Sequence, residues 1–263
     1  MRNPPATKQV ALMSAFAALI VLITRLPGIP IIGTPGAKLQ LSVVLYPLVG
    51  VLLGGEIGAM SVLVGNFVSW LIPSSTLLGL LMIPPGALSA LVAGSLGSTK
   101  RIFNWKLAFL VLLALDTLWY FTPVGLEAPF YPVLHWGSLL LVALFREKVH
   151  AFLGGPSKLR IMEGMAVCSF AGLMADSMAG NLTFIYAVGW VVPLNAVLEA
   201  TTRLGMFWLR LGIPKFPFTG LAGLFMGALV ITAIERTAMT IVSMLTGSAV
   251  LRLLGRDRPL TTT

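Results

Sequence analysis

Apolar residues recur along the chain in runs long enough to form membrane-spanning helices, and short polar or Pro/Gly-containing segments separate these runs. They lie at residues 8–25, 38–54, 57–72, 78–97, 106–122, 132–146, 161–180, 184–209 and 219–254. A transmembrane helix needs about 20 mostly apolar residues. The last run would form a helix of roughly 54 Å, longer than the ~30 Å hydrocarbon core. Either it breaks near Glu235 and Arg236 into two spans, or one earlier run is not a full span. The pattern predicts an all-α, polytopic transmembrane helix bundle of eight to ten spans, with residues 1–263 forming a single integral membrane domain.

The composition supports a membrane protein rather than a soluble one. Hydrophobic residues make up 57% of the 263 positions and charged residues only 10%, and the mean hydropathy is +0.94. A soluble domain carries about 25% charged residues because its surface faces water. Most of the surface of this chain is therefore expected to face lipid. The single cysteine, Cys168, lies inside an apolar run and is expected to be a buried structural thiol.

The excess of basic residues, which gives a formal charge of +9, is concentrated in short segments between the apolar runs. Arg2 and Lys8 precede the first run, and the segments 98–106 and 146–160 are also basic, whereas 73–77 and 123–131 contain no Lys or Arg. The positive-inside rule then predicts a multi-pass protein of the cell membrane with a cytoplasmic N-terminus. Arg203, Arg210 and Lys215 predict a cytoplasmic end for the run 184–209. No basic stripe alternates with aromatic residues, so no nucleic-acid partner is predicted.

Small residues form strips on several of the expected helices. Ala11 and Ala15 are four residues apart, and Ser14 and Ala18 complete the same narrow face near the cytoplasmic end. In lipid, close backbone approach across small residues is a main cause of helix association. The face either docks a partner subunit or packs internally. The series Gly50, Gly54 and Gly58, together with Ala90 and Gly94, is expected to serve internal helix packing.

Polar groups within the apolar runs are costly in a bilayer and are therefore candidate functional residues. Glu199 and Arg203 have the spacing of a helical ion pair, whereas the adjacent Glu235 and Arg236 are interpreted as a helix end or turn. The predicted orientation gathers a further set in the outer layer, where aromatic and hydrogen-bonding groups together are typical of a small-molecule pocket. The candidate substrate-binding residues are Asn66, Trp70, Asp116, Trp119, Tyr120, Asp176, Asn181, Trp190 and Asn195. An interfacial aromatic belt would explain the aromatic members alone, but not Asn66, Asp116, Asp176 and Asn195.

The first third of the chain resembles a known family. Ala11-xxx-Ala15 is followed by a Pro/Gly-rich loop at 27–36 and then by the segment 39–65, LQLSVVLYPLVGVLLGGEIGAMSVLVG. This pattern is similar to the substrate-binding membrane subunit (S component) of energy-coupling factor (ECF) transporters, which import vitamins and other micronutrients. Residues 193–199, PLNAVLE, resemble a late-helix pattern of the same family. Residues 1–97 carry the best match, and 98–263 hold late and extra helices, because the family usually has six helices in a shorter chain.

The resemblance implies partners and roles. The face of Ala11, Ser14, Ala15 and Ala18 would dock onto a transmembrane coupling subunit that two cytoplasmic ATPases drive. The loop 27–36 would gate an outward-facing site, where the outer-layer residues would bind a small-molecule ligand. No cofactor is implied for this subunit, and it would not be an enzyme.

Two other functions remain open on the sequence. An ion-coupled secondary transporter would need a protonatable residue, and Asp116, Asp176 or Glu199 could serve. An intramembrane enzyme has less support: the two histidines, His135 and His150, fall in different layers and predict neither a metal site nor a His-based dyad. Gly54-Gly55 lacks the Lys-Ser/Thr of a P-loop, so ATP hydrolysis by this chain itself is not predicted.

Overall fold

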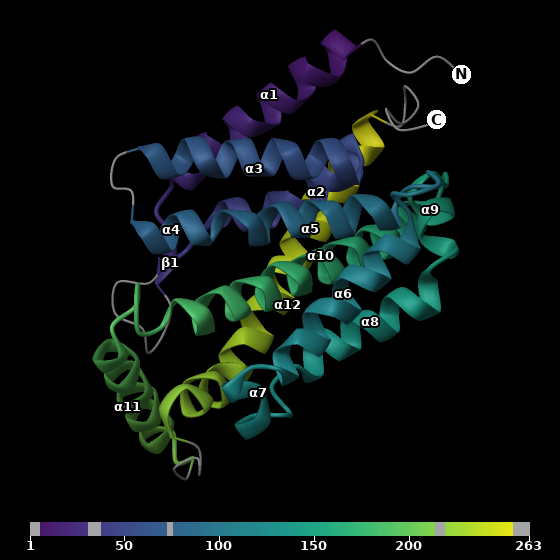
Figure 1. Ribbon diagram of the computed structural model, residues 1–263. Coiled ribbons are helices and arrows are strands. Elements are labelled where there is room, and N and C mark those ends of the chain that lie inside the picture. The colour runs from purple at the N-terminus through teal and green to yellow at the C-terminus, as the bar shows by residue number, and fades with distance from the viewer. Residues whose placement is uncertain (1–5, 31–37, 73–75, 214–218, 255–263) are drawn as a thin grey trace.

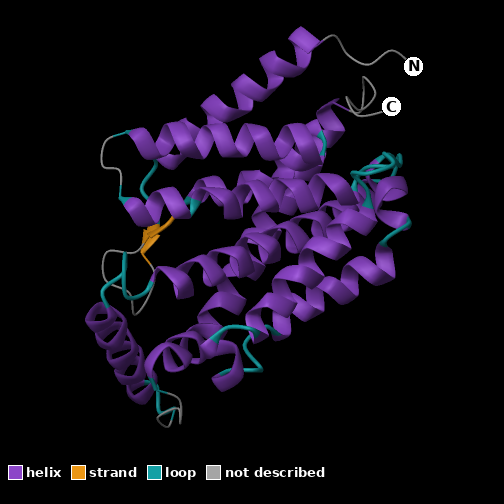
Figure 2. Ribbon diagram, viewed as in Figure 1, coloured by secondary structure: helices purple, strands orange, loops and turns teal. Residues whose placement is uncertain are grey.

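Helices account for nearly all the regular structure in the computed structural model, which describes residues 6–30, 38–72, 76–213 and 219–254. The exception in this part of the chain is an antiparallel pair of two-residue strands (Figure 2), β1 (Ile29–Pro30) and β2 (Lys38–Leu39). Ile29 pairs with Leu39. The all-α prediction is confirmed.

The helices follow one another through short connections. They are α1 (Ala6–Thr24), the 3-10 helix η1 (Leu41–Val44), α2 (Leu45–Leu53), α3 (Gly55–Leu71), α4 (Leu77–Leu81), α5 (Ile83–Leu96), α6 (Trp105–Tyr120), α7 (Pro123–Glu127), α8 (Val133–Phe145), α9 (Lys148–Leu153), α10 (Lys158–Ala187), α11 (Leu194–Arg210) and α12 (Gly220–Leu254). Several start at a side-chain cap. Thr76 Oγ1 accepts from Gly79 N at 3.1 Å, Asn104 Oδ1 from Lys106 N at 2.9 Å, and Thr122 Oγ1 from Gly125 N at 3.0 Å. These caps satisfy backbone donors that the first helical turn leaves free.

The long helices run side by side in one bundle (Figure 1). The described start of α1 and the end of α12 lie near the same end of the bundle, as does α9, which is part of the basic segment 146–160. The β1–β2 ladder and α11 lie at the opposite end. The bundle therefore has one end beside the basic segments 98–106 and 146–160, and one end away from them.

Three helical stretches are long and apolar enough to cross a membrane by length and composition: Thr7–Thr24, Leu77–Leu96 and Gly220–Leu254. Leu41–Leu53, Gly55–Leu71 and Val133–Phe145 are apolar but shorter. The number of full-length candidates among the described residues is therefore smaller than the predicted eight to ten spans.

The last third of the chain departs from the sequence prediction. Helix α12 continues without a break through Glu235 and Arg236, so the prediction of a helix end or turn there is wrong. Helix α10 has 30 residues and ends at Ala187, and a turn with Gly189 at φ 94° separates it from α11. The run 184–209 therefore does not form one span. Helix α11 lies at the end of the bundle opposite α9 (Figure 1). The prediction that placed Arg203 and Arg210 at the basic end is thus also wrong, while Lys215 lies outside the described residues.

Glycines allow α2, α3 and α5 to touch through their backbones. A Cβ atom at Gly50 would lie 2.1 Å from the carbonyl oxygen of Ala90, and one at Gly94 would lie 2.3 Å from the carbonyl oxygen of Gly50. A Cβ atom at Gly58 would lie 2.7 Å from the Cα of Gly50. The turn between α2 and α3 is made at Gly54, whose φ of 86° favours glycine. The expectation of internal helix packing is confirmed for Gly50, Gly58, Ala90 and Gly94, whereas Gly54 makes the turn and has no such contact.

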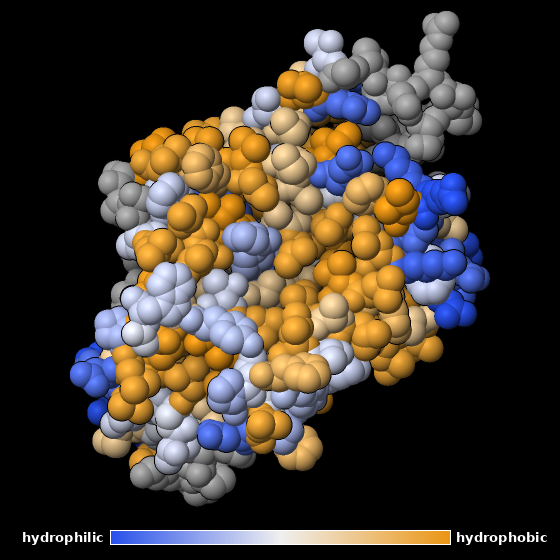
Figure 3. All heavy atoms as spheres, viewed as in Figure 1, coloured by the Kyte–Doolittle hydropathy of each residue, from blue (hydrophilic) through white to orange (hydrophobic). Residues whose placement is uncertain are grey.

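Large apolar side chains cover much of the outside of the bundle. Leu110 is 59% exposed, Leu140 60% and Leu144 61%. Figure 3 shows hydrophobic residues over the middle of the visible face and hydrophilic residues gathered beside α9 and towards the α11 end. An apolar surface of this extent marks a membrane or partner interface rather than a surface that faces water. Cys168, by contrast, is fully buried, as expected.

Candidate functional site

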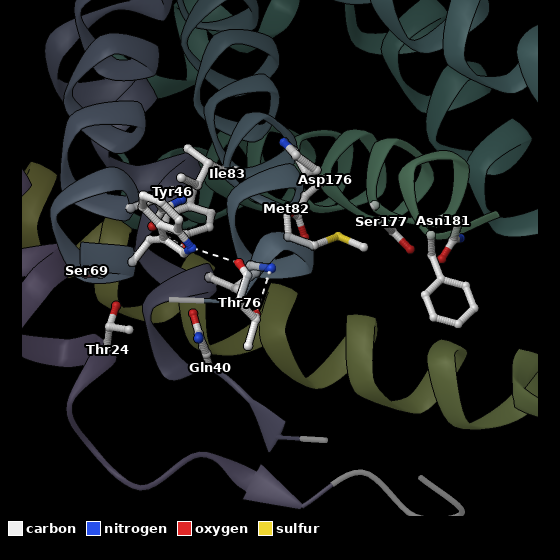
Figure 4. A pocket seen from close by; sticks show the side chains of 18 of the residues that line it. Thr24, Gln40, Tyr46, Ser69, Thr76, Met82, Ile83, Asp176, Ser177 and Asn181 are labelled. Atoms are coloured by element: carbon white, nitrogen blue, oxygen red, sulfur yellow. Dashed lines mark hydrogen bonds between the residues drawn. The ribbon is translucent and has the colours of Figure 1, made fainter. Parts of the chain in front are cut away.

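A cavity of about 640 Å³ opens at the end of the bundle away from the basic segments. Its walls come from the end of α1, from α2, α3, α4 and α5, from the second half of α10 and from the middle of α12. The lining residues are Thr24, Arg25, Gln40, Val43, Tyr46, Asn66, Ser69, Trp70, Ile72, Thr76, Gly79, Met82, Ile83, Pro85, Gly86, Asp176, Ser177, Gly180, Asn181, Phe184 and Arg236. In Figure 4, Gln40 lies near the β-strands and Thr24 lies to its left, while Asp176, Ser177 and Asn181 come from α10 on another side. The volume is that of a typical small-molecule site.

Tyr46 and Asn66 form one polar wall of the cavity. The hydroxyl of Tyr46 donates to Asn66 Oδ1 at 2.9 Å and lies 3.3 Å from Ser42 Oγ. Helix α5 can approach this pair because position 86 is glycine: a Cβ there would lie 2.6 Å from Tyr46 Cε2. The accepting oxygen of Asn66 is used by Tyr46, so its amide N–H groups remain as donors for a ligand.

Two hydrogen bonds hold the connections that border the cavity. Trp70 Nε1 donates to the carbonyl oxygen of Thr76 at 2.8 Å and so joins the end of α3 to the start of α4 (Figure 4). Arg25 Nη2 donates to the carbonyl oxygen of Ser69 at 2.8 Å and joins the end of α1 to α3. The cavity is therefore preformed along α3.

A cluster of three charged side chains lies on the α10–α12 side. Arg236 Nη1 donates to Asp176 Oδ2 at 2.9 Å, and Arg236 Nε lies 3.5 Å from Glu235 Oε1. The three side chains are only 12–18% exposed. Buried charges are tolerated when they are paired. The pair Asp176–Arg236 thus both joins two helices and presents charge to the cavity.

Arg236→Met is expected to destabilise the protein by up to about 3–5 kcal/mol, because two largely buried carboxylates would lose their only counter-ion in the described part of the chain. Thermal unfolding in detergent measures the effect. The matched control is Arg203→Met, since Arg203 pairs with Glu199 on the exposed surface of α11, where such a pair contributes about 0.5 kcal/mol or less. Equal shifts for the two variants would contradict this account of the cluster.

Four of the nine predicted substrate-binding residues line the cavity: Asn66, Trp70, Asp176 and Asn181. Asn66 and Trp70 are one helical turn apart on α3, and so face the same side. Asn181 Nδ2 donates to the hydroxyl of Tyr131 at 3.1 Å, which leaves its carbonyl oxygen as an acceptor. The predicted role of these residues in binding stays a prediction, but their gathering in one cavity is a property of the fold.

The other five lie elsewhere, so the nine do not converge in one pocket. Trp119 is fully buried in the core, where it stacks on Tyr131 with ring centroids 4.8 Å apart. Tyr120 donates to the carbonyl oxygen of Pro129, and Asp116 is fully buried on α6. Trp190 and Asn195 are exposed around the start of α11. None of the five is among the residues that line the cavity, and Trp190 lies in the turn between α10 and α11 rather than on a helix.

The sequence pattern does not predict several of the lining residues. Arg236 stands beside Glu235, a pairing that is also typical of a helix end, and Tyr46 lies in an otherwise apolar run. Gln40 and Thr76 lie in connecting segments. A possible signal was the four-residue spacing of Ser42 and Tyr46, which places two hydroxyl groups on one side of an apolar helix.

The predicted docking face on α1 is open. Ala11, Ser14, Ala15 and Ala18 are all exposed. Helix α1 instead packs on α3 through its other side, where Ala17 and Ile20 are buried and a Cβ at Gly65 would lie 3.0 Å from each. The small-residue face is therefore not used for packing within the described part of this chain. The predicted gate, the loop 27–36, lies largely outside the described residues, since 31–37 are not among them.

No cluster of His, Cys, Asp and Glu suited to a metal ion occurs within the described ranges. His135 is buried on α8, and His150 Nδ1 lies 2.8 Å from the carbonyl oxygen of Gly97 at the basic end. The two histidines thus have separate surroundings.

Comparison with known proteins gives one relative. An uncharacterized protein of Methanocaldococcus jannaschii is 30% identical over 134 residues, which cover 51% of this chain and 44% of that protein. No family model matches the chain, and no solved structure matches it. The chain thus matches less than half of its relative's length, and the relative's name assigns no activity.

Proposed function

We propose that the chain is an integral protein of the cell membrane with eight spans, formed by α1, α2, α3, α4 with α5, α6, α8, α10 and α12. The exposed apolar side chains on α6 and α8 support this arrangement. The basic segments at one end support a cytoplasmic N-terminus. Helix α11 is strongly amphipathic and buries Val197, Leu204 and Trp208 on one side. It suits a position in the outer membrane interface better than a span.

The chain acts, in this proposal, as the substrate-capturing membrane subunit of an energy-coupling factor importer for a vitamin or other small micronutrient. The observation that carries this proposal is the cavity, which combines aromatic walls, free amide groups and a buried ion pair at the bundle end away from the basic segments. A small-molecule pocket needs such convergent polar groups in apolar surroundings. An opening on the outer side suits capture of a solute from outside the cell.

The open face of α1 supports the second half of the proposal. In an ATP-driven importer, a subunit that captures the solute but does not hydrolyse ATP must contact the subunit that couples it to the ATPases. Ala11, Ser14, Ala15 and Ala18 are small and exposed, and would allow a helix of a transmembrane coupling subunit to approach closely. Two cytoplasmic ATPases would then drive the coupling subunit.

In liposomes the purified chain alone is expected to bind its solute without accumulating it, whatever proton or sodium gradient is applied. Adding a coupling subunit and its two ATPases should make accumulation depend on ATP. The measurements are retained radiolabelled solute and vesicle uptake, with the solute identified from material that co-purifies in mild detergent. Accumulation by the chain alone would contradict the proposal.

Asp116 favours a second candidate, an ion-coupled secondary transporter. This residue is fully buried on α6, and neither carboxylate oxygen has a hydrogen-bond partner among the described residues. A carboxylate in such surroundings is costly unless protonated, as in a proton-coupled carrier. Gradient-driven uptake by the lone chain, lost in Asp116→Asn, would establish this candidate over the first.

A further inference from the structure

The charged cluster beside the cavity contains two carboxylates and one guanidinium. Arg236 contacts Asp176 through Nη1 and Glu235 through Nε, so both carboxylates share a single cation. With all three groups ionised, the cluster carries one net negative charge in a poorly solvated place. A buried net charge is unfavourable until a counter-charge joins it.

The cluster responds differently to cations and to anions. If a cationic group contacts Asp176, Arg236 can stay neutralised by Glu235, and two balanced ion pairs result. An anionic group that approached Arg236 would instead be the third negative charge around one guanidinium. Like charges at such distances repel strongly where the local dielectric constant is low. Only a cation completes the pairing.

The rest of the cavity suits an organic cation. Tyr46 and Trp70 contribute aromatic rings to its walls, and the faces of such rings attract positive charge within about 6 Å. Arg25 is the other cation among the described lining residues. It is exposed and donates to the carbonyl oxygen of Ser69, so solvent screens its charge from the cluster.

We propose that the cavity binds an organic solute that carries one positive charge, with Asp176 as its counter-ion and Glu235 holding Arg236 in the bound state. This inference rests on the proposed function, because it takes the cavity as the solute site and names the charge class of the solute. Asp176 and Glu235 thereby have separate roles. Asp176 contacts the solute, and Glu235 pairs with Arg236 so that Asp176 is available to the solute.

Three probes of similar shape and different charge test the charge class: benzylammonium, benzamide and benzoate. Binding is measured by calorimetry and by Trp fluorescence on the full chain in detergent. Benzylammonium is expected to bind at least about 30-fold more tightly than benzoate, and Asp176→Asn to weaken benzylammonium binding by a similar factor. Glu235→Gln should also weaken it, since Arg236 would then retain Asp176. Glu199→Gln, which changes an exposed paired carboxylate on α11, is the control and should leave binding unchanged.

The variant Gly180→Leu tests whether the probes bind in the cavity. Gly180 lines the cavity, and a Cβ there would have only Met82 Sδ nearby, at 4.0 Å, so the larger side chain occupies free space and should abolish binding of every probe. Benzoate or benzamide binding that is tighter than that of benzylammonium, and sensitive to Gly180→Leu, would overturn the charge class while leaving a solute site. Benzylammonium binding that is equal in Asp176→Asn and wild type would also overturn it. Absence of any binding sensitive to Gly180→Leu would count against the cavity as the solute site, and so against the proposed function itself.

Discussion

Replacing Ala11 and Ala15 together with tryptophan is expected to abolish ATP-dependent uptake by the assembled importer while solute binding by the isolated chain stays within about twofold. Both residues are exposed on α1 and lie one helical turn apart. Two indole rings on this face would hold a partner helix several ångströms away, whereas the cavity, at the far end of α1, would be unchanged. Co-purification with the coupling subunit and vesicle uptake measure the effect.

The control places the same bulk at the same spacing elsewhere. Leu140 and Leu144 are four residues apart and about 60% exposed on α8. Their replacement with tryptophan should leave assembly and uptake intact, because lipid accommodates aromatic side chains. Normal assembly of the α1 variant would remove the docking role. Loss of assembly in both variants would show only that bulky residues disturb the bundle.

The sequence predicted the helical class because its apolar runs are as long as helices and are separated by short Pro/Gly or polar segments. With 10% charged residues and apolar runs throughout, helices are favoured because their backbone groups satisfy one another within each segment. Helix ends were predictable where a capping residue or a glycine stands at a boundary, as at Thr76 and Gly54. The glycine contacts between α2 and α5 also followed from a four-residue spacing.

The last third was harder to predict because its polar residues have partners that are distant in sequence. Arg236 is 60 positions from Asp176, so the ion pair that allows charge in the middle of α12 leaves no local pattern. Adjacent Glu235 and Arg236 look like a helix end when that partner is unknown. Helix α11 was hard to predict for a related reason. The sequence does not show whether its apolar side packs on another helix or lies on a bilayer.

For the candidate site, the direction in which each side chain points could not be predicted from the sequence. Positive-inside orientation placed nine residues in one layer, but which side of each helix faces the cavity depends on how the helices are rotated. Asn66 and Trp70 face it, whereas Asp116 and Trp119, three residues apart on α6, both face the core. Rotation is set by tertiary packing, above all by the glycine contacts that bring α2, α3 and α5 together.

The glycine contacts between α2 and α5 are expected to contribute strongly to stability. Gly50→Ala is expected to destabilise the protein by at least about 3 kcal/mol, at the upper end of overpacking effects, and to prevent recovery of monodisperse protein. The added methyl group would lie 2.1 Å from the carbonyl oxygen of Ala90, a backbone atom that cannot move without shifting α5. Because α5 also borders the cavity through Gly86, solute binding should fall with folding.

The matched control is Gly137→Ala. Gly137 lies within α8 and has no atom within 4 Å of the added Cβ, so the substitution should stabilise its helix by about 0.5–1 kcal/mol. The same chemical change is thus expected to act in opposite directions at two helical glycines, as measured by thermal unfolding in detergent. A Gly50→Ala protein that melts within a degree or two of wild type would mean that α2 and α5 do not touch through their backbones.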